Sequence, residues 1–222
     1  MTHDVYCFGD SHWRVFFPFV NHGSPGLIYE QDGIRMIDMV ANELSGATMY
    51  GLLNNDSKNG ARRRILSNLD SLGGVENVAL TFGEVDARYH NERYFVNELF
   101  SAGRAFDLLA RFKRFIDEDL LFTGRVRNSV FVYTGYHYPK WEQTLLQPGQ
   151  PIGDRIGQAA IMNEWMRWNL TSVLGCTGRT SPVKMVFGDP LLSSEQVSDD
   201  GVHLIPERIF PQVFAQVRDY LK

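Results

Sequence analysis

Short apolar runs alternate with longer stretches of helical periodicity along the chain. Five runs of apolar and β-branched residues predict buried strands at 5–8, 48–52, 78–82, 130–134 and 183–187. In the stretches between them, apolar residues recur three or four positions apart, which is typical of amphipathic helices. Strands that alternate with helices indicate parallel strands joined by crossover helices. We therefore expect an α/β fold of three layers, an α/β/α sandwich around a five-stranded parallel sheet.

Five stretches carry the helical periodicity, and we assign their apolar residues to the core. These are Ile34, Ile37, Val40 and Leu44; Ile65, Leu66, Leu69 and Leu72; an aromatic-rich stretch over 94–122; Ile161, Trp165, Trp168 and Leu170; and Phe210, Val213, Phe214, Val217 and Leu221. Proline is favoured in the first turn of a helix, so Pro206 or Pro211 is expected to begin the last one.

Length and composition narrow the class of protein. A chain of 222 residues with 44% hydrophobic content fits a single domain over 1–222. No apolar run reaches the roughly 20 residues of a membrane span, and a net charge of −4 disfavours a general nucleic-acid binder. The first ten residues lack the pattern of a secretory signal. Two cysteines, Cys7 and Cys176, are too few for a disulfide framework, so we expect reduced thiols and a cytoplasmic location.

Residues able to carry out acyl transfer stand at two distant places in the chain. Ser11 follows the first expected strand, at a turn where backbone N–H groups can stabilise an oxyanion. Asp200 and His203 lie three residues apart, just before the last helix. This spacing lets the carboxylate hold one imidazole nitrogen while the other faces a nucleophile. Cys7 precedes the turn, so we expect it to be a buried strand residue and not a nucleophile.

At these residues the sequence resembles the GDSL/SGNH hydrolase family. Gly9-Asp10-Ser11 is similar to the first sequence block of that family, and Asp200-Gly201-Val202-His203 is similar to its last block. The resemblance implies a flavodoxin-like sandwich with Ser11 as nucleophile, His203 as general base and then acid, and Asp200 as the residue that orients it. It also implies a small-molecule or carbohydrate acyl ester as substrate, and no cofactor or metal.

The third block departs from the family pattern, which is normally G-x-N-D. Here the chain reads Gly83-Glu84-Val85-Asp86-Ala87-Arg88, and the valine side chain cannot donate a hydrogen bond. A subgroup with G-E-[IV]-D-x-R at this place looks similar. We assign Gly83, Asp86 and Arg88 to the oxyanion and substrate side of the site. A guanidinium at Arg88 can stabilise an oxyanion or bind an anionic group, and its pairing with Glu84 or Asp86 as a salt bridge stays open.

The second block of the family is a glycine that donates its backbone N–H. Gly60, at the start of the helix over 61–72, is the first choice, and Gly51 is its rival. Asn54 lies between them and either places an amide near Ser11 or serves as an ordinary turn residue.

Three other functions compete with an esterase. Asp10-Ser11-His12 and Gly83 to Arg88 resemble parts of a metallophosphoesterase, although the chain has neither G-N-H-[DE] nor G-H-x-H. A non-catalytic ligand-binding domain on the same fold is favoured by Val85. A flavin or nucleotide binder is disfavoured because the chain has no G-x-G-x-x-G and no P-loop. Hydrolysis, acyl transfer and the identity of the acyl group all stay open.

Overall fold

The fold was analysed in a computed structural model that describes residues 2–10, 13–18, 26–39, 44, 49–52, 54, 57, 59–82, 109–133, 180–186 and 205–222. In chain order the described elements are β1 (His3–Gly9), the 3₁₀ helix η1 (Trp13–Phe16), β2 (Ile28–Gln31), β3 (Ile34–Asp38), α1 (Met49–Leu52), α2 (Ala61–Ser71), β4 (Val75–Thr81), the π-helix η3 (Phe115–Leu121), β5 (Val126–Tyr133), β6 (Val183–Val186) and α6 (Pro206–Leu221).

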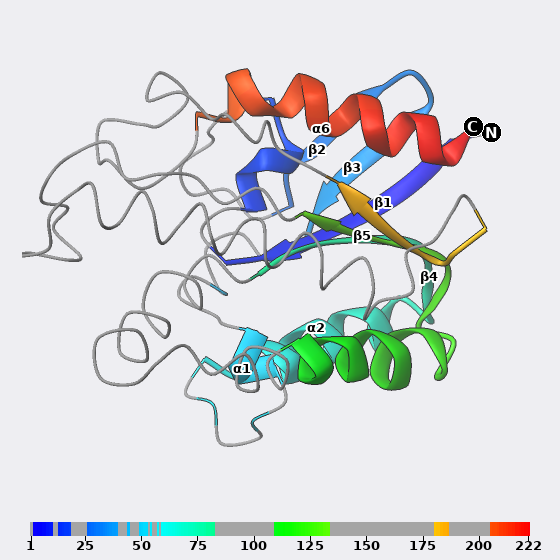
Figure 1. Cartoon of the computed structure of the whole chain (residues 1–222). Helices are drawn as coiled ribbons and strands as arrows, with labels where there is room; N and C mark the ends of the chain where they lie inside the picture. Colours follow the sequence, from blue (N-terminus) through cyan, green and yellow to red (C-terminus); the bar gives the residue numbers. More distant parts are fainter. Residues whose placement is uncertain are drawn as a thin grey trace, which may run out of the picture.

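The described strands form one sheet in the order β2-β3-β1-β4-β5-β6. Neighbours are parallel except for β2, which pairs antiparallel with β3 at the edge. Counting only the parallel strands in chain order, the arrangement is 2-1-3-4-5, which is the flavodoxin-like order. Helices cover both faces of the sheet (Figure 1). The expected α/β sandwich is confirmed, but the described part of the chain contributes six strands to the sheet and not five, because the antiparallel β2 adds to the five parallel strands.

The region over 28–38 is a β-hairpin, and the helix expected around Ile34 and Ile37 is wrong. Burial along β3 alternates with a period of two, which is the strand pattern. Asp32 and Gly33 form the turn between β2 and β3, with φ angles of 52° and 74°. Two consecutive residues with positive φ match the twist of a two-residue hairpin, which explains a glycine at the second position.

The strand expected at 48–52 is also wrong, because Met49–Leu52 forms the short helix α1. A short apolar run does not distinguish a buried strand from a buried helical turn. As residues of α1, Met49 and Leu52 are completely buried in the core on one face of the sheet. The place of the second parallel strand is taken by β3.

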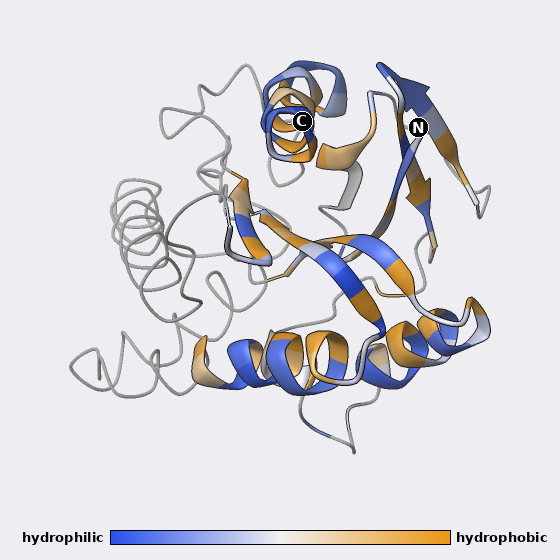
Figure 2. Cartoon of the chain, turned by 90° about the vertical axis from the view of Figure 1, so that its right-hand side faces the viewer, coloured by the Kyte–Doolittle hydropathy of each residue, from blue (hydrophilic) through white to orange (hydrophobic). Residues whose placement is uncertain are grey.

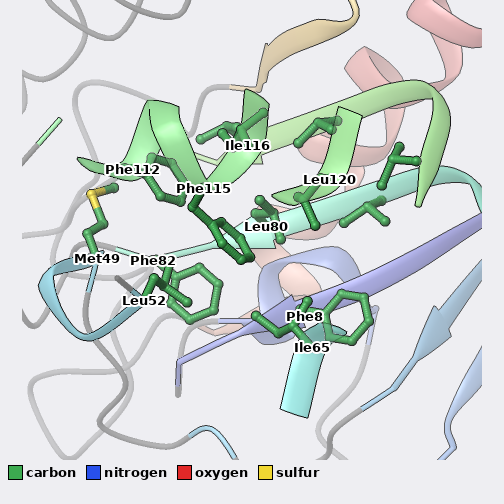
Figure 3. Close-up of a cluster of buried hydrophobic side chains, with 14 of the residues drawn as sticks. Phe8, Met49, Leu52, Ile65, Leu80, Phe82, Phe112, Phe115, Ile116 and Leu120 are labelled. Atoms are coloured by element: carbon green, nitrogen blue, oxygen red, sulfur yellow. The ribbon is translucent and has the colours of Figure 1, made fainter. Parts of the chain in front are cut away.

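The described side chains buried on the face of the sheet covered by α1, α2 and η3 are all apolar. Figure 3 shows side chains from β1, β4 and these helices meeting there, among them Phe8, Leu80, Ile65, Phe112 and Phe115. The helix expected from Ile65, Leu66, Leu69 and Leu72 is confirmed as α2, although Leu72 lies just past its end. Burial of these side chains supplies much of the hydrophobic stabilisation of the fold.

The opposite face is covered by η1 and α6. Val15, Phe16 and Phe17 pack with apolar residues of α6, and Pro206 occupies the first turn of that helix, as one of the two expected alternatives. Figure 2 shows hydrophobic residues on the sides of α2 and α6 that face the sheet. The terminal helix is thus confirmed. Of the remaining expected helices, residues 109–121 are helical, while 94–108 and 161–170 lie outside the described residues.

No helix within the described part of the chain has both the length and the apolar character needed to cross a membrane.

Candidate active site

The carboxyl ends of the five parallel strands meet at one edge of the sheet. At this edge Gly9 of β1 pairs with Thr81 of β4, and Tyr133 of β5 pairs with Val186 of β6. Four strand ends therefore lie in a row across the sheet. The segments that begin after these residues include Ser11 and the stretch from Gly83 to Arg88, so the fold directs both of them from the same edge.

The strand order reverses direction between β1 and β4. From β1 the chain continues to β3 on one side, and the next parallel strand, β4, lies on the other side. In open α/β sheets a crevice for ligands forms at such a switch point. The N–H of Asp10 donates to the carbonyl of Thr81 at 2.9 Å, which extends the pairing past the end of β1. Ser11 is the next residue, and Gly83 follows Thr81 by two.

The described residues on either side of the expected triad pack in one cluster. The helix η1 comes directly after Ser11-His12, and α6 begins three residues after His203, with Ile205 as its extended N-cap residue. Val15 and Phe16 of η1 share a buried apolar cluster with Ile209 and Phe210 of α6. Ser11 and His203 are about 190 positions apart in the sequence. Tertiary packing therefore brings together the two helices that follow them, η1 and α6.

Most of the candidate site residues themselves lie outside the described residues. These are Ser11, Gly83, Val85, Asp86, Arg88, Asp200 and His203. Their roles stay predictions, as does the subgroup motif of the third block. Gly51, Asn54 and Gly60 are described.

Gly60 is the N-cap of α2 and has a left-handed backbone, with φ of 55° and ψ of 27°. Its N–H donates to the carbonyl of Ser57 at 2.9 Å, and its carbonyl accepts from Arg64 N–H at 3.0 Å. A Cβ here would also lie 3.1 Å from a guanidinium nitrogen of Arg63. The left-handed backbone of the turn therefore favours glycine here. An oxyanion role for Gly60 would require the bond to Ser57 to open, and that role stays a prediction.

Asn54 belongs to the same set of turns. Its side chain is exposed, its N–H donates to the carbonyl of Gly51 at 3.3 Å, and its carbonyl accepts from Ser57 N–H at 3.0 Å. Gly51 is buried in α1. These bonds lead the chain from α1 into the N-terminus of α2. The choice between Gly60 and Gly51 for the second block, and an amide role for Asn54, are not tested by this arrangement.

Cys7 is buried in β1, as expected. Burial raises the pKa of its thiol well above the ordinary value, and the nearby charge of Asp38 raises it further. Cys7 and Asp38 are register partners on neighbouring strands. Because the thiolate is the nucleophilic form, Cys7 is held in its unreactive state.

The residues Thr81 and Tyr133 place hydroxyl groups at this edge that the sequence analysis did not single out. Both side chains are buried, and burial raises the pKa of Tyr133, so its hydroxyl stays protonated. The available signal was a polar residue at the end of each apolar run. In the described part of the chain, no group of three or more His, Cys, Asp or Glu side chains is placed to hold a metal ion.

Comparison with solved structures identifies relatives of this fold over nearly the whole chain. A carbohydrate acetylesterase from Sinorhizobium meliloti, Est24, matches with a TM-score of 0.53 and 16% identity, covering 99% of this chain and 98% of that one. A protein from Agrobacterium tumefaciens with a provisional arylesterase assignment matches with a TM-score of 0.54 and 16% identity, covering 99% and 100%. LAE5, an alpha/beta hydrolase enzyme from the metagenome of Lake Arreo, matches with a TM-score of 0.51 and 10% identity, covering 100% and 98%.

Comparison with protein-family models gives no match, and comparison with curated protein sequences gives none. The structural neighbours include esterases, and their likeness agrees with the α/β fold of a mostly parallel sheet flanked by helices that the sequence resemblance implied. At these levels of identity, the likeness establishes the fold.

Proposed function

We propose that this chain is a serine esterase that cleaves small acyl esters through Ser11, His203 and Asp200. The observation that carries the proposal is the pairing of the ends of β1 and β4 at the switch point, with Asp10 N–H bonded to Thr81 carbonyl at 2.9 Å. The serine and the third block both begin from this point. The esterases among the structural neighbours support the same chemistry.

The proposed reaction has two steps. Ser11 Oγ attacks the acyl carbonyl while His203 takes its proton, and Asp200 holds the imidazole in the required orientation. The C–O bond to the leaving alcohol breaks as His203 returns the proton to that oxygen. Water, or an acceptor hydroxyl, then attacks the acyl-enzyme with His203 again acting as base. The acyl group leaves as a carboxylic acid or as a new ester.

The oxyanion of each tetrahedral intermediate needs hydrogen-bond donors. Backbone N–H groups at Ser11 and at a second-block glycine are the proposed donors, assisted by the guanidinium of Arg88 in place of the absent asparagine. Loss of one such donor costs on the order of 10²–10³ in rate. Arg88→Ala is therefore expected to lower kcat by that factor, whereas a purely structural salt bridge would mainly lower stability.

A carbohydrate acyl ester is the preferred substrate class within this proposal. Est24 is a carbohydrate acetylesterase, and the aromatic residues Tyr136, Tyr138 and Trp141 follow β5 in the sequence. Aromatic faces bind sugar rings well. Acetylated xylose and an aryl acetate, compared at equal concentration, test this preference.

Fluorophosphonate labelling followed by intact-mass measurement and peptide mapping tests the proposal directly. We expect one adduct, on Ser11, that is lost in Ser11→Ala and in His203→Ala. Hydrolysis of p-nitrophenyl acetate should fall by about 10⁴-fold or more in the same variants, while Asp200→Asn keeps more activity. Ser71→Ala is the matched control, because Ser71 is exposed on α2 and its hydroxyl donates to the Asn68 carbonyl.

Other outcomes separate the competing functions. An adduct on a different serine, or normal turnover in Ser11→Ala, contradicts the mechanism. An unlabelled protein that contains stoichiometric metal and cleaves a phosphoester in a chelator-sensitive way is a phosphoesterase. An unlabelled, metal-free protein that binds but does not cleave acyl esters is a binding domain.

A further inference from the structure

Thr81 and Tyr133 are neighbours on adjacent strands, β4 and β5, at the end of the sheet. The register of β4 and β5 pairs Leu80 with Val132, and its next step places Thr81 beside Tyr133. Ala79 and Phe131, two residues earlier on each strand, pack in the cluster beneath η1 and α6. Because side chains alternate along a strand, Thr81 and Tyr133 point to that same face.

Both side chains are more than nine-tenths buried, with 4% and 3% of their surface exposed. Neither Thr81 Oγ1 nor Tyr133 Oη has a hydrogen-bond partner among the residues that the structure describes. Buried polar groups in proteins nearly always have a partner, since an unsatisfied hydroxyl loses its bonds to water on folding. Two such hydroxyls, on neighbouring residues of one face, therefore point to a partner that the described side chains do not supply.

The groups around the two residues include a glycine and an aromatic ring. Gly9, the neighbour of Thr81 on β1, has no side chain above the sheet at this point. The ring of Phe16 from η1 meets the Tyr133 ring edge-on, with centroids 6.3 Å apart. Each hydroxyl can donate one hydrogen bond and accept others. Internal water molecules in proteins typically make two to four such bonds.

We propose that Thr81 Oγ1 and Tyr133 Oη bind one buried water molecule between them, and that this water fixes the sheet edge against η1 and so positions Ser11. The second part rests on the proposed function. The first part does not, because the water site is a property of the two hydroxyls. Thr81 and Tyr133 are positioning residues in this scheme and do not touch the substrate.

The link to Ser11 runs through η1. Phe16 contacts Tyr133 and belongs to the helix that begins two residues after Ser11. On the other side, Asp10 is bonded to Thr81 through the backbone. The two hydroxyls thus stand between both anchors of the segment that carries the nucleophile. A small displacement of a reacting group is costly, up to roughly 100-fold in rate.

A crystal structure at high resolution, together with kinetics of four variants, tests both parts. Tyr133→Phe and Thr81→Val each remove one hydroxyl with little change in shape, and Thr81→Ser restores the hydroxyl. Tyr29→Phe is the matched control: Tyr29 packs in the same cluster, but its hydroxyl donates to Gln31 at the far edge. We expect density for one water within hydrogen-bond distance of both hydroxyls, absent in Tyr133→Phe.

For the kinetics, we expect Tyr133→Phe and Thr81→Val to lower kcat and the fluorophosphonate labelling rate by roughly 10-fold, with KM unchanged. Thr81→Ser and Tyr29→Phe should match the wild type. A crystal structure in which both hydroxyls bond to protein groups, with no shared water, contradicts the water site. A shared water with normal kinetics in both variants overturns the positioning role. If the wild type is itself unlabelled, the proposed function fails, and the crystallographic result still decides the water site. If Tyr133→Phe does not fold, the melting temperatures of Thr81→Val and Thr81→Ser test the hydrogen bond to the water instead. Equal melting temperatures overturn that bond.

Discussion

The two faces of the sheet carry different kinds of buried side chain. Strand positions that face α2 and η3 hold, among the described residues, no buried polar group. Strand positions that face η1 and α6 hold all of the buried polar strand side chains that the structure describes, together with Cys7 and Tyr133. By alternation with the apolar residues of that cluster, these are Asp38, Asn77, Thr81, Ser129 and Lys184.

This difference suggests a different role for each face: the α2 face contributes stability, and the α6 face holds the polar groups that lie near the proposed site. Apolar burial on the α2 face stabilises the protein without directional constraints. Polar groups on the α6 face need specific partners, as with Asn77, which donates to the carbonyl of Asp4 and accepts from Asn128, or Lys184, which lies over the ring of Tyr220. That second face is also where the segments following Ser11 and His203 pack. We infer that packing on the α6 face sets the positions of the site residues, whereas packing on the α2 face stabilises the sheet.

The largest effect should come from a cavity on the apolar face. Phe112 is completely buried there, so Phe112→Ala is expected to lower the free energy of unfolding by about 3–5 kcal/mol. The rate of fluorophosphonate labelling per folded molecule should stay near that of the wild type. Urea denaturation and labelling at low temperature measure the two quantities.

Phe131→Ala is the companion variant, since Phe131 is equally buried on the α6 face. It should lose similar stability and also react more slowly with the phosphonate. Equal labelling rates in Phe112→Ala and Phe131→Ala would show that the α6 face has no special role in positioning the site.

An intermediate effect should appear at alkaline pH and arise from the α6 face. Burial raises the pKa of Cys7 and of Tyr133 above the values of about 9.0 and 10.0 that they have in the unfolded chain. Both stay neutral in the fold, so their contribution is fully present below those unfolded-chain values and is lost as the pH rises from them through the raised pKa values of the fold. The free energy of unfolding should fall by at most about 1.4 kcal/mol per pH unit for each group.

Urea denaturation between pH 7 and 10.5 measures this slope. Cys7→Ala should flatten it from about pH 9, and Tyr133→Phe from about pH 10. A wild-type stability that does not change over this range would show that neither group is held neutral by the fold.

The smallest effect should come from the rim of the apolar face. Arg125 donates two hydrogen bonds to Asp70 at 2.6 and 3.1 Å, and these bonds lower the pKa of that carboxyl. Asp70 is half exposed, so solvent and salt screen the pair. The stabilisation is present above the ordinary pKa of aspartate and is lost as the pH falls through the lowered value.

Asp70→Asn should therefore shift the melting temperature slightly at pH 7, less in high salt, and progressively less as the pH falls below the ordinary pKa of aspartate. Glu76→Gln, which weakens a similarly exposed pair with Arg127, provides the control. A loss comparable to that in Phe112→Ala would mean that ion pairs, and not apolar burial, hold α2 in place.

Periodicity predicted the elements whose hydrophobic pattern is long or strongly apolar. The strands β1, β4, β5 and β6 and the helices α2 and α6 were located from the sequence, to within a few residues at their ends. The failures involve short segments. Ile34 and Ile37 fit a helical spacing, but the Asp32-Gly33 turn and the pairing of β3 with β1 favour a strand. Local spacing is weaker than tertiary pairing over so few residues.

The chemical inventory follows from the amino-acid sequence alone: a serine after the first strand, a D-x-x-H before the last helix, and a valine where the pattern it resembles has an asparagine. The sequence also predicted that parallel strands would end at one edge. Which strands are neighbours, and hence that the ends of β1 and β4 pair at the switch point, depends on how the chain folds in three dimensions. So does the gathering of the buried polar side chains of the strands on one face. Strand order and register depend on contacts between distant segments, and no local pattern along the chain encodes which pair will form.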